Sequence, residues 1–316
     1  MTFLTDPTFV GFLSASMRLA IPIMLAALGG LFAERSGVLN IGLEGMMLVG
    51  AFVGFVATFW TGQLWIGVII AVLAGMVFGL ILGFYTITLG ANQVVVGIAM
   101  NLLAVGVTSF FYRMAFGAGT DRPRIDSFTP LDLGPLVDIP VIGPLLFRQD
   151  ALAYLGLGLI LVTWFVMAKT RFGLNVRAVG EHPQAAETLG VDVQHIRYVA
   201  IGLSGGLAGL GGAFLSLSAT GVFLDNMTAG RGYIALAILI LGRRHAIGVL
   251  LAALLFGAAD ALQLRAQILP TGVPFQFLLM LPYVLTIIVL AGFVGRNSAP
   301  AALGVPFRRG RSGKDD

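Results

Sequence analysis

Apolar runs long enough to cross a lipid bilayer alternate with short polar breaks along most of the chain. A helix of about 20 apolar residues spans the hydrocarbon core of a membrane. The pattern predicts spans at 9–33, 41–60, 64–89, 94–111, 151–168, 198–217, 246–264 and 276–294, and a half-length segment at 233–241. We therefore expect an all-α, polytopic membrane helix bundle of about nine (eight to ten) transmembrane segments, some of them broken or half-length.

One polar stretch, residues 169–197, holds more charge than a membrane span tolerates. Each Arg, Lys or Asp at the centre of a span costs roughly 2.5 to 3.5 kcal/mol on insertion, so we expect this polar island to lie in water. Within it, residues 183–189 predict one short surface helix, because proline suits a first turn and Ala-Ala-Glu favours helix. Gly190 supplies the stop.

Two other stretches, residues 34–45 and 219–242, interrupt the apolar pattern without the length of a proper loop. The first is predicted to be either a tight turn at the surface or a broken helix inside the bundle. Transporters use paired helix interruptions to build a solute site near the membrane midplane. The two breaks suggest such a site, although no sequence repeat between the two halves of the chain is evident.

Composition agrees with a membrane protein. The 316 residues are 58% hydrophobic and only 11% charged, with a mean hydropathy of +0.95, which leaves too little polar surface to cover a soluble globule. The 43 glycines include Gly50 and Gly54, Gly202 and Gly206, and the series 75, 79, 83, at the spacing that lets helices approach closely in lipid. Glycine is also simply common in such helices, so each pair has this plainer interpretation. Without cysteine, disulfide and thiol chemistry are excluded.

The distribution of charge predicts how the chain sits in the membrane. The net charge is +4, and the cations are spread among loops rather than gathered on one face, which favours positive-inside bias over nucleic-acid binding. We expect the island, the Arg243-Arg244 turn and the basic tail (296–316) in the cytoplasm, and the loop at 112–150 outside. Five spans before the island then place the N-terminus outside, on an uncleaved first helix.

The sequence contains almost no motif that indicates an enzyme. Neither lysine follows the glycine-rich pattern of a nucleotide-binding loop, and no His-Glu-x-x-His sequence is present. The three histidines fall in predicted turns, where solvated or capping roles are more common than metal binding. We therefore expect no catalytic residue and no metal site.

Four polar residues within or beside the apolar runs are candidates for a solute pathway: Asn40, Glu44, Asn92 and Asn101. A carboxylate inside a span marks a pathway or pairs with a buried partner, for which Arg35 is one choice near Glu44. Simpler alternatives remain open for each residue. A surface carboxylate at a helix start would also suit Glu44, and hydrogen bonds between helices would also suit the asparagines.

Three blocks of sequence resemble one protein family: SGVLNIGLEGMM at 36–47, RFGLNVRAVGE at 171–181 and LSGGLAG at 203–209. They closely resemble the permease subunits of bacterial ABC importers in the branched-chain amino acid and simple-sugar group, and the resemblance covers nearly the whole chain. The Leu-Asn-Ile-Gly-Leu-Glu-Gly sequence at 39–45 is typical of the nucleoside branch. Sugar permeases of the ribose type usually carry Gly-Ile-Asp-Leu-Ser there, which this chain lacks.

The resemblance also implies how the permease domain, residues 1–295, meets its ATPase. The sequence Gln-Ala-Ala-x-x-x-Gly at 184–190 is similar to the Glu-Ala-Ala loop by which permeases dock on their ATPase. Gln replaces Glu, which puts a salt bridge from the first position in doubt but not the docking. The residues expected to couple to the ATPase are Arg177, Glu181, Gln184, Ala185, Ala186 and Gly190.

The function implied by the resemblance is that of a permease subunit in an ATP-driven nucleoside importer of the bacterial cell membrane. The chain would bind no cofactor, with ATP on the partner. The implied partners are ATPase subunits, a second permease in a heterodimer, an extracytoplasmic solute-binding lipoprotein and membrane lipid. Transport of simple sugars or branched-chain amino acids remains an alternative. An ion-coupled secondary transporter would need acidic residues in the core, and beside Glu44 only Asp260 is a candidate, which better suits an interfacial position.

Overall fold

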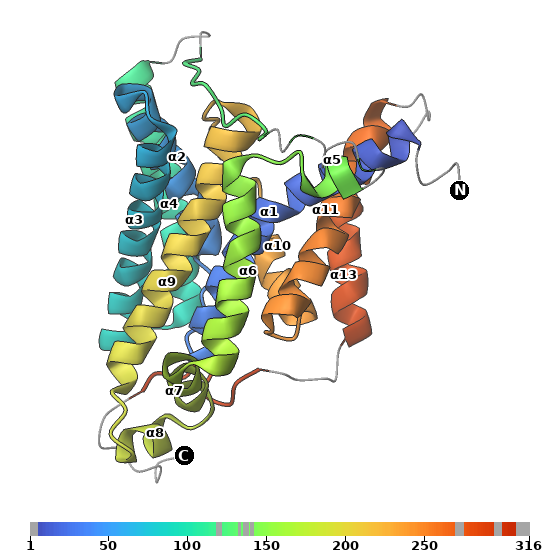
Figure 1. The fold of residues 1–316 in the computed structure, drawn as a ribbon. Coiled ribbons are helices and arrows are strands. Elements are labelled where there is room, and N and C mark those ends of the chain that lie inside the picture. Colours follow the sequence, from blue (N-terminus) through green and yellow to red (C-terminus); the bar gives the residue numbers. More distant parts are fainter. Residues whose placement is uncertain are drawn as a thin grey trace.

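A computed structural model shows a bundle built from helices (Figure 1). It describes residues 6–117, 122–131, 134, 139, 142–268, 275–293 and 299–307. The long elements are α1 (Pro7–Arg35), α2 (Leu43–Thr61), α3 (Leu64–Gly83) with the π-helical turn η1 (Phe84–Thr88), α4 (Gln93–Phe116), α6 (Ala151–Lys169), α9 (Val193–Ala213) with the π-helical turn η3 (Phe214–Thr220), and α11 (Ala246–Ile268). The shorter ones are α5 (Ile142–Leu146), α7 (Arg171–Glu181), α8 (Pro183–Thr188), α10 (Arg231–Leu241), α12 (Phe275–Leu279) and α13 (Leu281–Phe293).

Within the described residues, seven helices are long and apolar enough to cross a membrane. The predicted all-α polytopic bundle is thereby confirmed, and α10 is the expected half-length segment. The last predicted span, 276–294, is divided at Met280 into α12 and α13. Pro282 lies in the first turn of α13, and because proline has no N–H to donate to a preceding turn, a new helix starts there.

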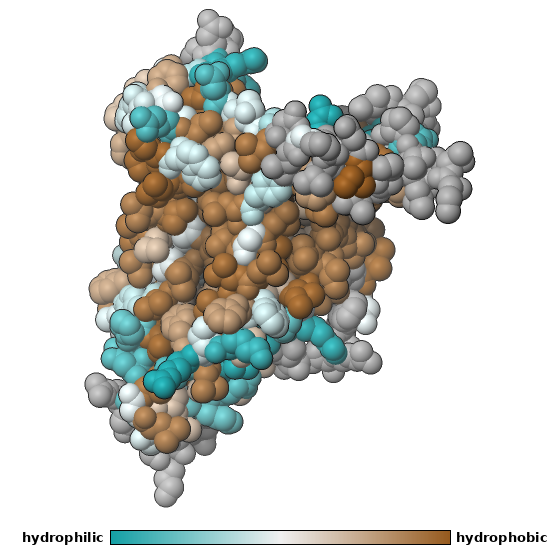
Figure 2. Space-filling view, in the orientation of Figure 1, coloured by the Kyte–Doolittle hydropathy of each residue, from teal (hydrophilic) through white to brown (hydrophobic). Residues whose placement is uncertain are grey.

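The surface carries an apolar band between two polar ends (Figure 2). The start of α1 and α5 lie at one end of the bundle, and α7 and α8 lie at the other (Figure 1). An odd number of spans lies between the start of α1 and the polar island. The two must therefore lie at opposite ends of the bundle. The apolar band is the part of the surface suited to lipid.

Helix α9 lies at the centre of the bundle, packed against α1, α2 and α3. Its glycines let neighbouring backbones approach. A Cβ added to Gly75 of α3 would lie 2.3 Å from the carbonyl oxygen of Gly205, and one added to Gly50 of α2 would lie 2.4 Å from the Cα of Gly209. The close approach predicted for these α2 and α3 glycines is therefore confirmed, and it is what lipid-embedded helices need for van der Waals packing.

The Gly202 and Gly206 pair in α9 makes looser contacts. A Cβ added at either position would meet side chains of α3 at 3.4 Å, an ordinary van der Waals distance. The tightest contacts of α9 come instead from Gly205, Gly209 and Gly212.

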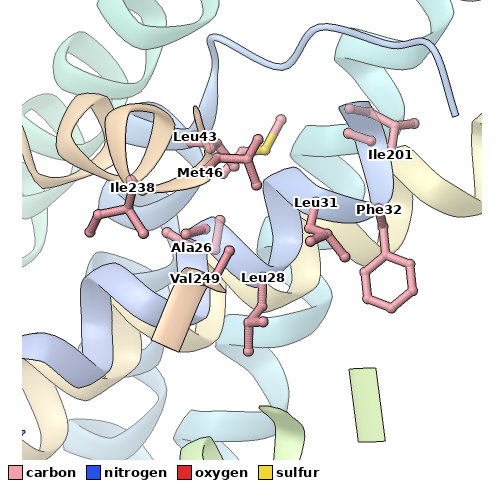
Figure 3. Close-up of a cluster of buried hydrophobic side chains, with 14 of the residues drawn as sticks. Ala26, Leu28, Leu31, Phe32, Leu43, Met46, Ile201, Ile238 and Val249 are labelled. Carbon is pink, nitrogen blue, oxygen red and sulfur yellow. The ribbon is translucent and has the colours of Figure 1, made fainter. Parts of the chain in front are cut away.

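A cluster of buried apolar side chains fills the interior of the bundle (Figure 3). Those labelled in the figure come from α1, α2, α9, α10 and α11: Ala26, Leu28, Leu31, Phe32, Leu43, Met46, Ile201, Ile238 and Val249. The half-length helix α10 is therefore held in the core although it cannot cross the membrane alone.

The polar island contains two whole helices and the first residues of α9, so the prediction of a single helix is wrong. The expected helix is present as α8, and Gly190 follows it with φ of +84° and donates its N–H to the carbonyl of Glu187. The additional helix is α7, whose start is capped by Thr170. Gly173 and Gly180 weaken the helical signal of this stretch. Both are needed for close packing, since a Cβ on either would overlap a neighbouring backbone carbonyl.

The predicted outer loop and basic tail are described only in part. Residues 122–131 run along the end of η3, where Phe128 donates its N–H to the carbonyl of Leu217. In the tail, residues 299–307 fold back onto the bundle. Residues 118–121, 132, 133, 135–138, 140, 141, 296–298 and 308–316 of these two predicted segments lie outside the described residues.

Candidate functional site

The two predicted helix breaks meet inside the bundle. The first break, residues 36–42, joins α1 to α2 and is largely buried, and the second break, residues 221–230, leads into α10. Of the two alternatives for the first, the surface turn is wrong, because the structure shows a largely buried, non-helical connection between α1 and α2. Irregular backbone is tolerated at membrane depth only where protein surrounds it and satisfies its hydrogen bonds.

The carboxylate of Glu44 joins the two breaks. One oxygen accepts the N–H of Gly230 at 2.8 Å, and the other accepts the N–H of Gly232 at 2.6 Å. The residue is 5% exposed. A carboxylate suits this place because the first N–H groups of α10 have no partner within their own helix and carry positive partial charge. Gly232 allows the approach, since a Cβ there would lie 2.4 Å from the backbone of Glu44.

Arg35 is not the partner of Glu44, so that prediction is wrong. Its Nε donates to the carbonyl of Arg244 at 2.9 Å, while the side chain of Arg244 pairs with Glu34 at 2.5 Å in a buried salt bridge. Glu34 and Arg35 are adjacent at the end of α1, and both hold the turn that follows α10. Glu44 instead points to the opposite end of α10, where backbone N–H groups replace a cationic side chain.

Asn101, in the middle of α4, binds three elements of the site. Its Oδ1 accepts the N–H of Gly45 at 2.8 Å, and its Nδ2 donates to the carbonyl of Ile41 at 3.0 Å and to the hydroxyl of Tyr233 at 2.9 Å. The asparagine is buried, whereas Tyr233 is 47% exposed. The amide therefore connects the first break to a half-exposed tyrosine at the start of α10.

Asn40, which lies in the first break, forms hydrogen bonds that hold the break in place. It is fully buried, donates its Nδ2 to Ser204 Oγ at 2.9 Å, and accepts the N–H of Gly42 at 3.0 Å. Gln93 completes the set by accepting the N–H of Leu39 at 2.6 Å. These bonds hold the break in one conformation, because an unsatisfied peptide group at this depth would cost several kcal/mol.

Asn92 lies apart from these residues. Its side chain accepts the N–H groups of Val94 and Val95, so it caps the first turn of α4. Nine residues along a helix correspond to about 13 Å, which separates this cap from Asn101 on the same helix. The structure brings together Asn40, Glu44 and Asn101, while a pathway role for Asn92 stays a prediction.

Two tyrosines that the sequence did not mark flank the start of α10. Besides Tyr233, Tyr283 of α13 is 50% exposed and donates its hydroxyl to the carbonyl of Ala229 at 3.1 Å. Tyr233 lies where a turn-rich stretch of the sequence becomes apolar, and this position is a sequence signal for a residue at a helix start. Nothing local in the sequence predicts that α13 reaches the second break.

This arrangement gathers polar side chains at one place in the bundle. It offers amide, phenol and carboxylate groups around a helix N-terminus, with two aromatic faces nearby. Among the residues that the structure describes, no cluster of His, Cys, Asp or Glu could hold a metal ion. The groups present can recognise hydroxyl, amide and ring substituents of a ligand through hydrogen bonds and stacking.

The residues predicted to couple to an ATPase lie at the end of the bundle with α7 and α8. Arg177, Gln184 and Ala185 are exposed, whereas Ala186 is buried against the bundle. Glu181, at the end of α7, accepts the N–H of Ala301 at 3.2 Å. The exposed face of α8 and the neighbouring Leu189, which is 84% exposed, are free to contact another protein.

The chain matches a protein family described as "Branched-chain amino acid transport system / permease component" over residues 12–290. The guanosine ABC transporter permease protein NupQ of Bacillus subtilis is 40% identical over 306 residues, 94% of this chain and 96% of that protein. The nucleoside ABC transporter permease protein NupC of Lactococcus lactis is 37% identical over 295 residues, 90% and 93% of the two chains. The putative glucose ABC transporter permease protein TsgC13 of Haloferax volcanii is 42% identical over 261 residues, 81% and 78%.

Proposed function

The chain belongs to this family of transport permeases and is the membrane permease of an ABC importer, and from that premise we propose that the solute it carries is a nucleoside. Its spanning helices lie in the cell membrane. Two of the three relatives named above carry guanosine or nucleoside in their names, and the third carries glucose. A sugar is therefore the alternative against which the proposal is tested.

The observation that carries the proposal is the polar cluster at the two breaks. A nucleoside combines a ribose with a flat base, so its site needs hydrogen-bonding groups and aromatic faces together. Glu44, Asn101 and Tyr233 lie within one hydrogen-bonded cluster, and Tyr283 stands beside the same helix start. Asn40 holds the break that precedes Glu44.

Energy for transport comes from partner subunits in this proposal. The chain would pair with a second, different permease, with ATPase subunits that bind ATP, and with a solute-binding lipoprotein outside the cell. The polar island would face the cytoplasm, as would the tail, and the 112–150 loop would face outward. Support comes from the position of α7 and α8 at the end opposite to the start of α1 and from positive-inside bias.

Loss of this chain should abolish high-affinity nucleoside uptake by cells. We expect a strain without it to lose uptake of radiolabelled guanosine at low concentration, while uptake of labelled glucose and leucine stays unchanged, and the intact gene to restore the lost activity. The measurement is initial uptake rate for the three solutes in matched strains. Loss of glucose or leucine uptake with guanosine uptake intact would refute the nucleoside proposal.

The exposed face of α8 should bind the ATPase. Ala185→Arg places a long cation on that face without touching the core, because Ala185 is exposed. We expect the ATPase recovered with the purified permease to fall about tenfold, equivalent to about 1.4 kcal/mol of binding energy, with no change in thermal stability. His245→Arg, an exposed position in the turn after α10, serves as the control. Equal recovery with Ala185→Arg and the control would contradict docking at α8.

A further inference from the structure

Residues 299–307, here called the C-terminal strap, tie together three elements that are far apart in the sequence. Ala302 donates its N–H to the carbonyl of Gly180 at the end of α7, at 2.9 Å. Gly304 donates to the carbonyl of Gly37 in the first break, at 3.0 Å. The carbonyl of Val305 accepts Nη1 of Arg197, in the first turns of α9, at 3.1 Å. The strap thus joins α7, α9 and the first break.

Arg197 is the centre of this junction. It is 1% exposed, and its Nε donates to the carbonyl of Ser36 at 3.2 Å, at the end of α1. No salt bridge reaches it from any residue in the described part of the chain, and its Nη2 has no hydrogen-bond partner there. A buried guanidinium held by main-chain carbonyls alone is costly to keep. Such a group is retained where its geometry serves a purpose that an apolar residue could not.

The backbones at the junction are in direct contact. A Cβ on Gly180 would lie 2.1 Å from the carbonyl oxygen of Arg35 and 3.3 Å from the nitrogen of Gly37. Gly37 has φ of +88°, and a Cβ there would lie 2.9 Å from Nη2 of Arg197. The end of α7, the first break and the guanidinium therefore cannot move independently without losing these contacts.

We propose that Arg197 and the C-terminal strap transmit the movement of α7 and α8 to the first break, and so couple ATP hydrolysis on the partner to opening of the solute site. The inference rests on the proposed function, which puts the ATPase at α8. A displacement of α8 would reach the first break through Gly180 of α7 and through Arg197 of α9. The C-terminal strap is hydrogen-bonded to both of these residues. The break ends next to Glu44, whose carboxylate holds α10.

Arg197 is a positioning residue in this scheme, because it contacts backbone carbonyls and not the solute. Lysine could replace its charge, but its donors all lie on one nitrogen, so it cannot reproduce the planar, separated Nε and Nη1 donors that bind the two carbonyls. Methionine would fill similar space without donating a hydrogen bond. The strap can be tested separately by ending the chain at residue 298, with a chain ending at residue 307 as the control that keeps every contact described above.

The test is the number of guanosine molecules imported per ATP hydrolysed by the complete importer in lipid vesicles. We expect Arg197→Met and the chain ending at 298 to lower this ratio about tenfold, the size of coupling that contiguous contact networks carry. The ATPase should still bind and hydrolyse ATP in both variants. Arg197→Lys should give an intermediate ratio, and the chain ending at 307 should match the intact chain.

Arg243→Met provides a matched control, because Arg243 is exposed in the turn after α10 at the same end of the bundle. A purely structural role for Arg197 would lower uptake and ATP hydrolysis in proportion, and an unchanged ratio in Arg197→Met and in the chain ending at 298 would overturn the proposal. If Arg197→Met does not fold, Arg197→Lys and the two shortened chains decide the matter. Failure of the nucleoside proposal itself would look different, since the intact importer would then move no guanosine at all.

Discussion

Replacing Glu44 with alanine is expected to remove most nucleoside uptake and to destabilise the bundle. Alanine would leave the N–H groups of Gly230 and Gly232 without the carboxylate that accepts them. A buried donor without a partner costs about 1 to 3 kcal/mol, so the start of α10 should detach from α2. The measurements are initial guanosine uptake by the assembled importer and the thermal unfolding midpoint of the purified permease.

Two further substitutions make this result specific. Glu44→Gln keeps one acceptor oxygen, so both uptake and midpoint should fall between the intact protein and Glu44→Ala. Asp225→Asn removes a carboxylate that is 48% exposed and lies 3.7 Å from Arg113. An exposed pair of this kind contributes at most about 1 kcal/mol, so little should change. Normal uptake and an unshifted midpoint in Glu44→Ala would show that the carboxylate does not hold the site together.

Replacing Gly212 with alanine is expected to prevent normal packing of α2 against α9. The added Cβ would lie 1.8 Å from the carbonyl oxygen of Met47 and 2.8 Å from the nitrogen of Ala51. Both are backbone atoms, so the helices themselves must separate. Overpacking typically costs about 1 to 3 kcal/mol, and we expect the upper part of that range, with a lower yield of folded protein and a lower unfolding midpoint.

The control for this experiment is Gly158→Ala in α6, where an added Cβ meets no atom within 4 Å. Alanine is favoured over glycine in a helix by roughly 1 kcal/mol, so this variant should be as stable as the intact protein or slightly more so. If the two alanine variants melted at the same temperature, the close crossing of α2 and α9 would be contradicted.

The sequence was sufficient for features that depend on the length and polarity of a single stretch. The long spans follow from their apolar runs, and α8 follows from Pro183 and Gly190 at its two ends. The half-length α10 was predicted for the same reason. Helix α7 was not, because Gly173 and Gly180 weaken local helical preference and serve contacts with distant backbone.

The long-range contacts of the candidate site could not be predicted from the sequence around each residue. Glu44 and Asn101 are buried polar groups, as expected for their place in the apolar runs, but their partners at the start of α10, in the first break and on α2 were invisible in the sequence. Asn92 looked equivalent to Asn101, yet it caps α4. Its position just before an apolar helical run is the ordinary place for such a cap, so sequence reasoning could have separated the two.

The proposed junction also alters how the polar island works. A single surface helix would act as a lever alone, whereas α7, the C-terminal strap and Arg197 form one connected unit with the first break. In this proposal, movement at α8 would reach Glu44 through a short series of contacts. The proposed solute site and the proposed ATPase contact would thus be linked by residues that bind neither partner.

The most direct measurement is guanosine uptake into lipid vesicles containing this permease, its partner permease, the ATPase and the solute-binding lipoprotein. We predict saturable uptake that requires ATP and the ATPase. A large excess of unlabelled adenosine or another nucleoside should reduce this uptake, whereas an excess of glucose should not. Uptake by this chain without the ATPase, driven by a proton or sodium gradient, would contradict the account.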